Sequence, residues 1–311
     1  MACYMIEIVD CSSWQPYEGI AEGSGRSEKQ WLVSSDGRVG LFKYPKYDPV
    51  SKSATCEHIS EHLAHKVGDL LTVNTAKVDL GVYNRRIGSI SHLIVREEES
   101  LVEGLQFILG KHPRYDDSLL YDESSGEYYS LKHIFEITSS EVINHYWVKM
   151  LLFDFVIGNS DRHHSNWAFI LSRSRDDESG IIKVAPCPLY DNGSSLCCFI
   201  REDQLKSYLG NDVMRFNSLV DTKSISMVRV NPLVKKRPPH SEVVRYLLAT
   251  QPSARPIAEL FLERLTMDTI RSLIEVYQDK LVSPERKSLL IKYLAKKADM
   301  LREFVAEREY V

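Results

Sequence analysis

The sequence predicts an α+β protein with a small β-rich part in residues 1–95 and a larger helical part in residues 96–311. Short apolar runs separated by turn signals dominate the first part, and apolar residues at helical spacing with cap signals dominate the second. A chain of 311 residues can bury one large core or two smaller ones. This order of elements fits several two-lobed folds and does not choose among them.

Four strands are expected in the first part. The first two are joined by Asp36 and Gly37, a strong hairpin signal. In the third, Val78, Leu80 and Val82 alternate as on a half-buried strand. The expected strands are QWLVS (30–34), GRVGLFKYP (37–45), AKVDLGVYN (76–84) and RRIGSISHLIV (85–95).

A helix is expected between the two strand pairs, at residues 56–68. Ile59, Leu63 and Val67 fall on one helical face, and Gly68 is expected to end the helix. The first part therefore has the order strand, strand, helix, strand, strand.

Two long helices frame the second part. Residues 139–158 begin with serine caps and run apolar into Gly158, and a buried strand is expected at 167–171. Ser283, Pro284 and Glu285 form a helix start, after which apolar side chains keep helical spacing. These side chains, expected as core, are Leu290, Leu294, Leu301 and Phe304. Exposed loops are expected at 121–130 and 171–180, and a basic, solvated loop at 235–240.

Composition and charge exclude several classes of protein. The net charge of −4 and the pI of about 6.2 do not indicate general binding to nucleic acid or to anionic membranes. The six cysteines form no CxxC pair, which favours reduced thiols and a cytoplasmic location, with secretion as an effector left open. The N-terminus does not have the pattern of a signal peptide, and no apolar run is long enough to span a membrane.

Polar residues are concentrated between two apolar elements in IGNSDRHHSNWAFI, residues 157–170. Asp161 and Asn166 lie five residues apart in this loop, and Asp191 follows a second apolar run. Such oxygen ligands suit Mg²⁺, which takes one or two carboxylates together with substrate phosphates. Phosphoryl transfer by protein kinases needs an Asp as base and an Asn and a second Asp as metal ligands. Ordinary turn residues are the alternative interpretation.

A lysine in the first part completes this set of residue types. Lys43 lies near the end of an expected strand. In a kinase, a lysine at this place holds the phosphates of ATP. The alternative is a lysine on an edge strand that faces solvent. Glu57 and Glu61 lie one turn apart in the following helix, and the sequence does not choose between them as its ion-pair partner. Upstream, a loop with Gly19, Gly23 and Gly25 could cradle phosphate through backbone N–H groups, although it is not a Walker A sequence.

Together these motifs resemble the HipA-like kinase family, bacterial serine/threonine kinases related to eukaryotic protein kinases and phosphatidylinositol kinases. The matches follow the order of the family over residues 20–195. Because the phosphate loop begins near residue 19, the chain resembles the short, CtkA-like or HipT-like members. The matching segments are the loop ending at Lys29 and residues 42–45, 56–68, 86–91, 158–167 and 188–193.

The resemblance implies a two-lobed protein-kinase-like fold, with an N-lobe at 1–95 and a C-lobe at 96–311. It implies that Asp161 is the catalytic base, that His163 props the catalytic loop, and that Asn166 and Asp191 hold Mg²⁺. Ser24 and Ser27 become candidates for autophosphorylation. Residues expected to contact ATP are Ser24, Gly25, Lys29, Lys43, Glu57, Leu93 and Ile94, the last two in a hinge at 92–96.

The implied function is an ATP-dependent serine/threonine protein kinase that transfers the γ-phosphoryl group to a Ser or Thr hydroxyl and also phosphorylates itself. Its expected partners are a protein substrate with a Ser or Thr acceptor and an antitoxin or regulatory protein, with no direct contact to nucleic acid. A lipid or small-molecule kinase on the same fold and a non-catalytic ATP-binding toxin–antitoxin regulator are the alternatives.

A metal-dependent hydrolase that uses the histidine-rich stretches is a further alternative. His58 and His62 lie four residues apart on the expected helix, with His65 nearby. No glutamate directly follows the first histidine, so the HExxH zinc motif is absent and solvated helix histidines are expected.

Overall fold

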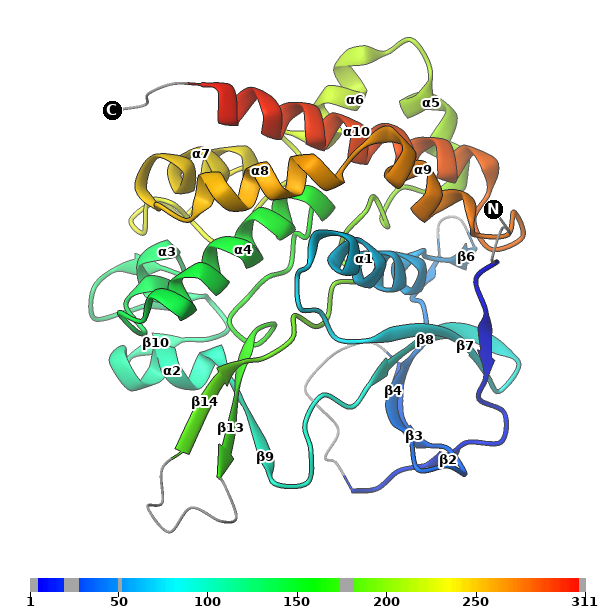
Figure 1. The fold of residues 1–311 in the computed structure, drawn as a ribbon, viewed down its shortest axis with the longest axis horizontal. Coiled ribbons are helices and arrows are strands. Elements are labelled where there is room, and N and C mark those ends of the chain that lie inside the picture. The colour runs from blue at the N-terminus through cyan, green and yellow to red at the C-terminus, as the bar shows by residue number, and fades with distance from the viewer. Residues whose placement is uncertain (1–4, 20–27, 50–51, 174–181, 308–311) are drawn as a thin grey trace.

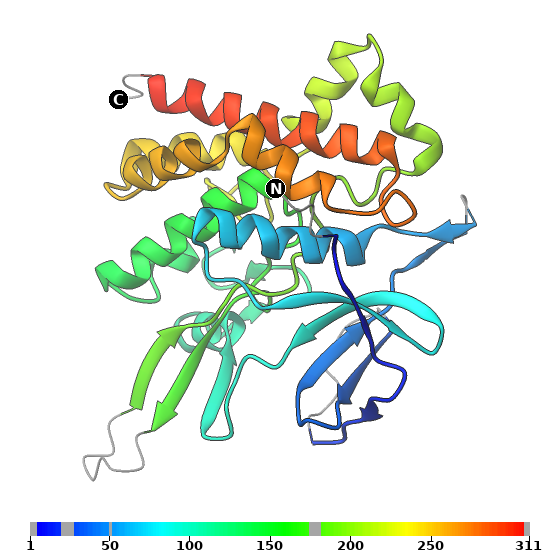
Figure 2. The ribbon, with the colours of Figure 1, turned by 45° about the vertical axis from the view of Figure 1, so that its right-hand side comes forward.

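The computed structural model describes residues 5–19, 28–49, 52–173 and 182–307. Figure 1 shows a sheet from the N-terminal part on one side, a layer of C-terminal helices on the other, and α1 (Glu57–Leu71) between them. The same order of layers is seen in the turned view of Figure 2. The boundary predicted at residue 95 falls between strands of two different sheets, and the division into lobes at that residue stays a prediction.

The N-terminal part forms a six-stranded sheet with the order β1-β7-β8-β4-β3-β2. The predicted hairpin is confirmed, with Gly37 at a φ of 84° in the left-handed region that glycine adopts without strain. The two later strands also pair as predicted. The strands are β1 (Ile8–Asp10), β2 (Gln15–Pro16), β3 (Lys29–Val33), β4 (Val39–Lys43), β7 (Val78–Tyr83) and β8 (Arg86–His92). Next to them lies the two-stranded hairpin of β5 (Tyr47–Asp48) and β6 (Ser53–Ala54).

Helix α1 is longer than predicted. The expectation that Gly68 ends it is wrong, because the helix continues to Leu71 and closes on Thr72 in the left-handed conformation, with a φ of 54°. Gly68 serves close packing instead: a Cβ at this position would lie 2.6 Å from the side chain of Thr75. Ile59, which the sequence placed on the packed face, is buried as expected.

Two small sheets lie beyond the N-terminal sheet. One has the order β14-β13-β9, so that β13, predicted as a buried strand, pairs with a strand from the chain segment after residue 95. The other has the order β10-β11-β12. Their strands are β9 (Glu99–Glu103), β13 (Ala168–Arg173), β14 (Ile182–Pro186), β10 (Tyr115–Asp116), β11 (Tyr121–Asp122) and β12 (Glu127–Tyr128).

The prediction of an exposed loop at 121–130 is wrong. This segment contains β11 and β12, and Tyr129 and Ser130 are fully buried. The hydroxyl of Tyr129 accepts a hydrogen bond of 2.8 Å from the indole N–H of Trp167, so burial of the aromatic side chain outweighs the polar composition of the segment. The other exposed loop was predicted at 171–180, and its residues 174–180 lie outside the described residues.

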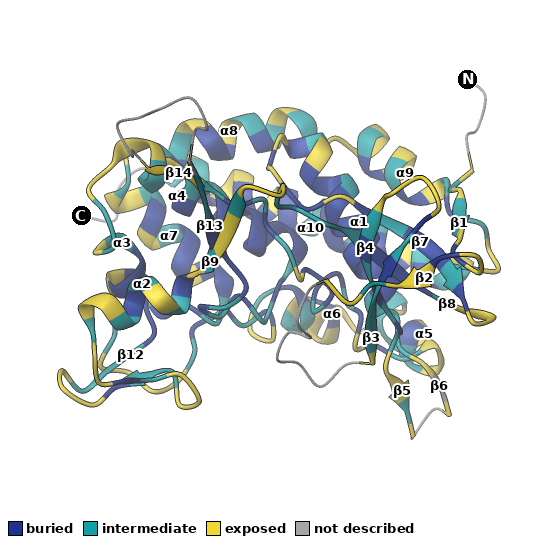
Figure 3. Ribbon diagram, turned by 90° about the horizontal axis from the view of Figure 1, so that it is seen from below, coloured by how far each residue is buried: buried dark blue, intermediate teal, exposed yellow. Residues whose placement is uncertain are grey.

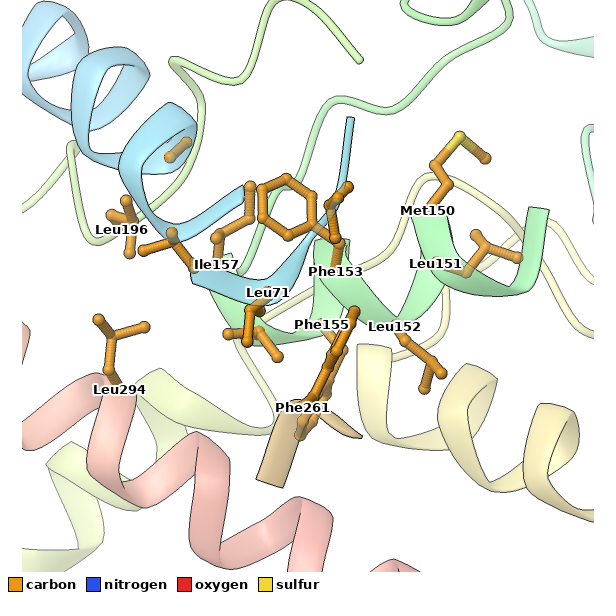
Figure 4. Close-up of a cluster of buried hydrophobic side chains, with 14 of the residues drawn as sticks. Leu71, Met150, Leu151, Leu152, Phe153, Phe155, Ile157, Leu196, Phe261 and Leu294 are labelled. Carbon is orange, nitrogen blue, oxygen red and sulfur yellow. The ribbon is translucent and has the colours of Figure 1, made fainter. Parts of the chain in front are cut away.

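Helix α4 (Glu141–Ile157) forms the centre of the helical part. Residues 147–157 are buried except Lys149, because the helix is apolar on nearly all sides and packs against α7, α8 and α10. Phe155 and Ile157 lie among side chains from the surrounding helices (Figure 4). Gly158 ends the helix in the left-handed conformation, with a φ of 66°, as predicted.

The last helix also begins where the sequence predicts. Ser283 accepts a hydrogen bond from the backbone N–H of Arg286, and the predicted leucine stripe is buried. Buried positions concentrate on the inner faces of the helices, whereas peripheral loops are exposed (Figure 3). The remaining helices are α2 (Gly104–Lys111), α3 (Leu131–Phe135), the 3₁₀ helix η1 (Glu202–Gln204), α5 (Leu205–Leu209), α6 (Val213–Val220), α7 (His240–Thr250), α8 (Ala254–Arg264), α9 (Met267–Glu275) and α10 (Pro284–Ala306).

Two further expectations can be compared with the described residues. The five cysteines in the described part of the chain are all free, in agreement with the prediction of reduced thiols. Among these residues, no helix is both long and apolar enough to cross a membrane.

Candidate active site

A cleft of about 860 Å³ lies between the N-terminal sheet, helix α1 and the loops of the helical part. Lys29, Lys43, Glu57, Leu93 and Ile94, all predicted to contact ATP, line it. The residues predicted for catalysis and metal binding line the same cleft: Asp161, His163, Asn166 and Asp191. The predicted loop residues Ser24, Gly25 and Ser27 lie outside the described residues.

Lys43, on strand β4 of the sheet, forms ion pairs with helix α1 and with a loop of the helical part. Its ammonium donates to the Glu61 carboxylate at 2.9 Å and to the Asp191 carboxylate at 3.0 Å. Ser89, paired with Lys43 across β4 and β8, donates to the second oxygen of Glu61 at 3.2 Å. Burial alone would lower the pKa of Lys43, but the two carboxylates raise it, so the ammonium stays charged.

The partner of Lys43 is therefore Glu61 and not Glu57. Glu57 accepts instead from the ammonium of Lys46 at 2.9 Å, one turn closer to the start of α1. Glu57 still lines the cleft, but its carboxylate pairs with Lys46 and not with Lys43. The helical face carries both acids, and the position of α1 against the sheet decides which one reaches the lysine.

The loop after α4 is folded by its own polar side chains. The side-chain oxygen of Asn159 accepts from the backbone N–H of Asp161 at 3.1 Å, and the amide of Asn166 donates to the Asp161 carbonyl at 2.7 Å. Asp161 is thereby fixed from both sides of the loop. Burial raises the pKa of the Asp161 carboxyl, an effect that the nearby His163 opposes and Asp191 reinforces.

His163 also belongs to this loop. Its Nδ1 atom accepts from the backbone N–H of Ser165 at 3.2 Å, and its carbonyl accepts from the backbone N–H of Asn166 at 2.9 Å. These contacts support the geometry of the loop at the point where Asn166 enters the cleft. They are compatible with the propping role that the resemblance implies.

The side chains of Asn166 and Asp191 have the chemistry to hold Mg²⁺. The amide nitrogen of Asn166 is used by the Asp161 carbonyl, which leaves its oxygen to serve as a ligand. The Asp191 side chain is 51% exposed toward the cleft, and Lys43 lowers its pKa, so it is a carboxylate that a cation can reach. One amide and one carboxylate oxygen match the few protein ligands that Mg²⁺ takes beside phosphates.

A buried ion pair, which the sequence analysis missed, supports the candidate ligands. Arg162 is 1% exposed and makes two-pronged contacts with Asp154 of α4, the shortest at 2.9 Å. Its other N–H groups donate to the backbone carbonyls of Asn166 and Tyr190 and to the side chain of Asn192. One guanidinium thus ties the two loops together. The signal was present in the sequence, because a single acid within the apolar run VKMLLFDFV requires a buried partner.

The segment predicted as a hinge borders the cleft. The backbone N–H of Leu93 donates to the Val39 carbonyl at 2.9 Å, so this amide is already used within the protein. The side chains of Leu93 and Ile94 line the cleft next to Val95. An apolar wall of this kind suits a flat aromatic ring.

The histidines of α1 do not form a metal site. The expectation that they are solvated is wrong, since His58, His62 and His65 are buried. His62 contacts the hydroxyl of Tyr277 at 2.6 Å, and burial lowers its pKa to about 4. Over the described ranges, no cluster of three or more His, Cys, Asp or Glu side chains could hold a metal ion.

The comparisons with known proteins bear on the fold. No protein-family model and no curated protein matches the sequence. Among solved structures, the chain is similar to the proinflammatory kinase CtkA of Helicobacter pylori, with a TM-score of 0.78, 18% identity, and coverage of 97% of this chain and 100% of that one. A chain from the complex of Shewanella oneidensis HipA, HipB and operator DNA matches with a TM-score of 0.53 and 14% identity.

The second match covers 93% of this chain and 66% of the other, so the present chain spans about two thirds of that protein. At these identities the likeness shows the fold. The chain is an α+β protein with the fold of the Helicobacter pylori kinase CtkA, a β-sheet part followed by a helical part, and the predicted fold class and fold resemblance are confirmed.

Proposed function

We propose that the chain is an ATP-dependent phosphotransferase that acts on a serine or threonine hydroxyl of a protein. The observation that carries the proposal is the convergence of Lys43, Asp161, Asn166 and Asp191 on one cleft in a kinase fold. Lys43 comes from the sheet and the other three from two loops of the helical part, which is how protein kinases supply these residue types for phosphoryl transfer.

The proposed reaction assigns each side chain a separate task. Lys43, held by Glu61, binds the α- and β-phosphates of ATP, and the apolar wall at Leu93 and Ile94 receives the adenine. Asp161 accepts the proton of the acceptor hydroxyl as the oxygen–phosphorus bond forms and the bond to the β-phosphate oxygen breaks, leaving ADP. Bound Mg²⁺ neutralises phosphate charge, and Asn166 and Asp191 are the residues that would hold it.

A protein partner beside the substrate is also part of the proposal. The Shewanella oneidensis structure contains HipA together with HipB and operator DNA. By analogy, an antitoxin-like or regulatory protein is the partner class to be sought for this chain. Autophosphorylation at Ser24 or Ser27 belongs to the same proposal, and so does an ATP-contact role for Ser24, Gly25 and Lys29.

The test measures Mg²⁺-ATP binding and phosphoryl transfer separately. Asp161→Asn should bind ATP within about threefold of the wild type and lose transfer to a Ser/Thr peptide library by about 100-fold or more, because a positioned base contributes about 10²–10⁴-fold. Lys43→Met should lose both ATP affinity and transfer, since its phosphate contact is gone. Asp268→Asn, which changes an exposed acid on α9, should alter neither.

The outcomes separate the proposal from its alternatives. Tight ATP binding without transfer in the wild type would favour a non-catalytic regulator. Transfer to lipid or to small alcohols but not to peptides would favour the other class of kinase. Full transfer by Asp161→Asn would refute the assignment of the base.

A further inference from the structure

A buried chain of hydrogen bonds connects the last helix to the candidate catalytic loop. The Lys297 ammonium of α10 donates to the Ser224 hydroxyl at 2.9 Å. That hydroxyl lies 3.1 Å from Nδ1 of His240, the first residue of α7. Nε2 of His240 lies 2.9 Å from the backbone carbonyl of Asn159, two residues before Asp161. Lys297 is fully buried, and the other side chains of the chain are at most 7% exposed.

The polar partners of His240 restrict its protonation. The Asn159 carbonyl can only accept, so the bond at Nε2 requires a proton on that nitrogen. Nδ1 faces the Ser224 hydroxyl at 3.1 Å and the Ser224 carbonyl at 2.8 Å. The Ser224 carbonyl can also only accept, so a neutral ring donates to one of the two carbonyls; when its proton is on Nε2, the Ser224 hydroxyl can donate to Nδ1.

Lys297 favours this arrangement in two ways. By donating to the Ser224 oxygen, it leaves the hydroxyl proton available to Nδ1 or to Tyr293, which also bonds this hydroxyl. In addition, burial, together with the nearby Lys297 charge, lowers the pKa of His240 to about 3, which disfavours a doubly protonated ring. The other charged groups that face this chain are Arg237, which lowers the same pKa, and Asp221, which opposes the effect of burial on Lys297.

We propose that His240 is a positioning residue for the transfer reaction: it holds the catalytic loop through a hydrogen bond from Nε2 to the Asn159 carbonyl, while Ser224, which Lys297 contacts, bonds its Nδ1. The inference rests on the proposed function for its effect on catalysis. The link is short, because the side chain of Asn159 accepts from the backbone N–H of Asp161. His240 therefore acts on the residue whose side chain holds the backbone of the proposed base.

Other hydrogen bonds also hold this end of the loop, among them one from the side-chain amide of Asn159 to Asp154 at 3.2 Å and one from the Ser160 backbone N–H to the Ser194 carbonyl at 3.1 Å. The Asn159 backbone N–H donates to the Asp154 carbonyl at 3.0 Å, and Arg237 donates to the Ser160 carbonyl at 3.4 Å. The bond from His240 is shorter than the Arg237 contact and is buried. Its loss should let Asn159 and Asp161 shift together, and a displacement of about 1 Å in a reacting group can cost about 100-fold in rate.

The closing experiment compares two amide substitutions in the full chain. Glutamine places its N–H₂ group where Nε2 lies and can still donate to the Asn159 carbonyl, whereas asparagine reaches only to the position of Nδ1. We expect kcat of His240→Asn to fall by about 10–100-fold with KM for ATP within about twofold, and His240→Gln to recover to within about threefold of the wild type. His145→Asn, at an exposed position of α4, is the matched control and should have no effect.

A second readout does not depend on activity. Amide hydrogen exchange of peptides that cover residues 158–167 should be faster in His240→Asn than in the wild type, and close to the wild-type rate in His240→Gln. If the wild type transfers no phosphate, the proposed function fails, and the exchange data alone decide whether His240 holds the loop. Equal kcat and equal exchange in the two variants would overturn the inference, as would an equal loss of ATP affinity and transfer in both. If neither amide variant folds, Ser224→Ala replaces them and should show the same loss of kcat and faster exchange, with Ser224→Thr as its rescue.

Discussion

Removing the charge of Asp154 should destabilise the protein far more than removing an exposed acid. Asp154 and Arg162 are 2% and 1% exposed, and the guanidinium makes three contacts of 2.9–3.3 Å to the carboxylate. With Asn in its place, a buried cation has no counter-charge, and an amide N–H₂ group faces it. Breaking a buried pair in this way costs about 3–5 kcal/mol, a large part of the usual 5–15 kcal/mol of stability.

The assay for Asp154→Asn is urea unfolding, followed by tryptophan fluorescence. Its matched control is Asp203→Asn, since Asp203 forms a similar pair with Arg201 at 3.0 Å but its side chain is 64% exposed. The control should lose at most about 1 kcal/mol, because solvent screens exposed pairs. A loss below about 1 kcal/mol for Asp154→Asn, or one no larger than that of the control, would refute the reasoning.

Two further predictions concern pH and packing. Burial alone would raise the pKa of Asp122, but hydrogen bonds from Ser124, Ser125 and His112 lower it to about 2. The stability advantage of the wild type over Asp122→Asn should therefore shrink as the pH falls from about 4 to 2; an advantage that persists in full at pH 2 would contradict it. In unfolding experiments Gly88→Ala should lose about 1–3 kcal/mol, because its Cβ would clash with the Lys43 carbonyl, while Gly110→Ala in α2 has open space and should gain up to about 1 kcal/mol. Equal effects of the two alanines would show that the clash is relieved without cost.

Elements with strong local signals were predictable from the sequence. The hairpin at Gly37, helix α4 up to Gly158 and the start of α10 at Ser283 follow from turn and cap residues that act within a few positions. The residue types at Lys43 and Asp161 predicted that both line one cleft, because kinase chemistry needs them together. The structure brings them there, although their roles stay proposals.

The failures have a common physical cause, which is packing between separate elements of the fold. Gly68 lies inside a helix because it fits against Thr75, and no local rule reports that contact. The choice of Glu61 over Glu57 depends on how α1 sits against the sheet. Residues 121–130 look like a loop in composition, but Tyr129 is buried against Trp167.

The supporting polar residues were missed for the same reason. Arg162 reaches Asp154 across one helix end, but His240 lies 81 positions after Asn159 in the chain, and Lys297 lies 73 positions after Ser224. A buried lysine cannot be told from a solvated one by spacing alone. Its burial becomes visible only when the helices are packed.

The central claim is that this cleft transfers the γ-phosphoryl group of ATP. The most direct measurement is the intact mass of the purified protein, with a Ser/Thr peptide library in the same mixture, after incubation with Mg²⁺-ATP beside the Asp161→Asn variant. We predict added phosphoryl groups on the protein or the peptides for the wild type and none for the variant, with mapping of the modified sites to test Ser24 and Ser27. Equal phosphorylation in both proteins, or none in the wild type despite bound ATP, would contradict the claim.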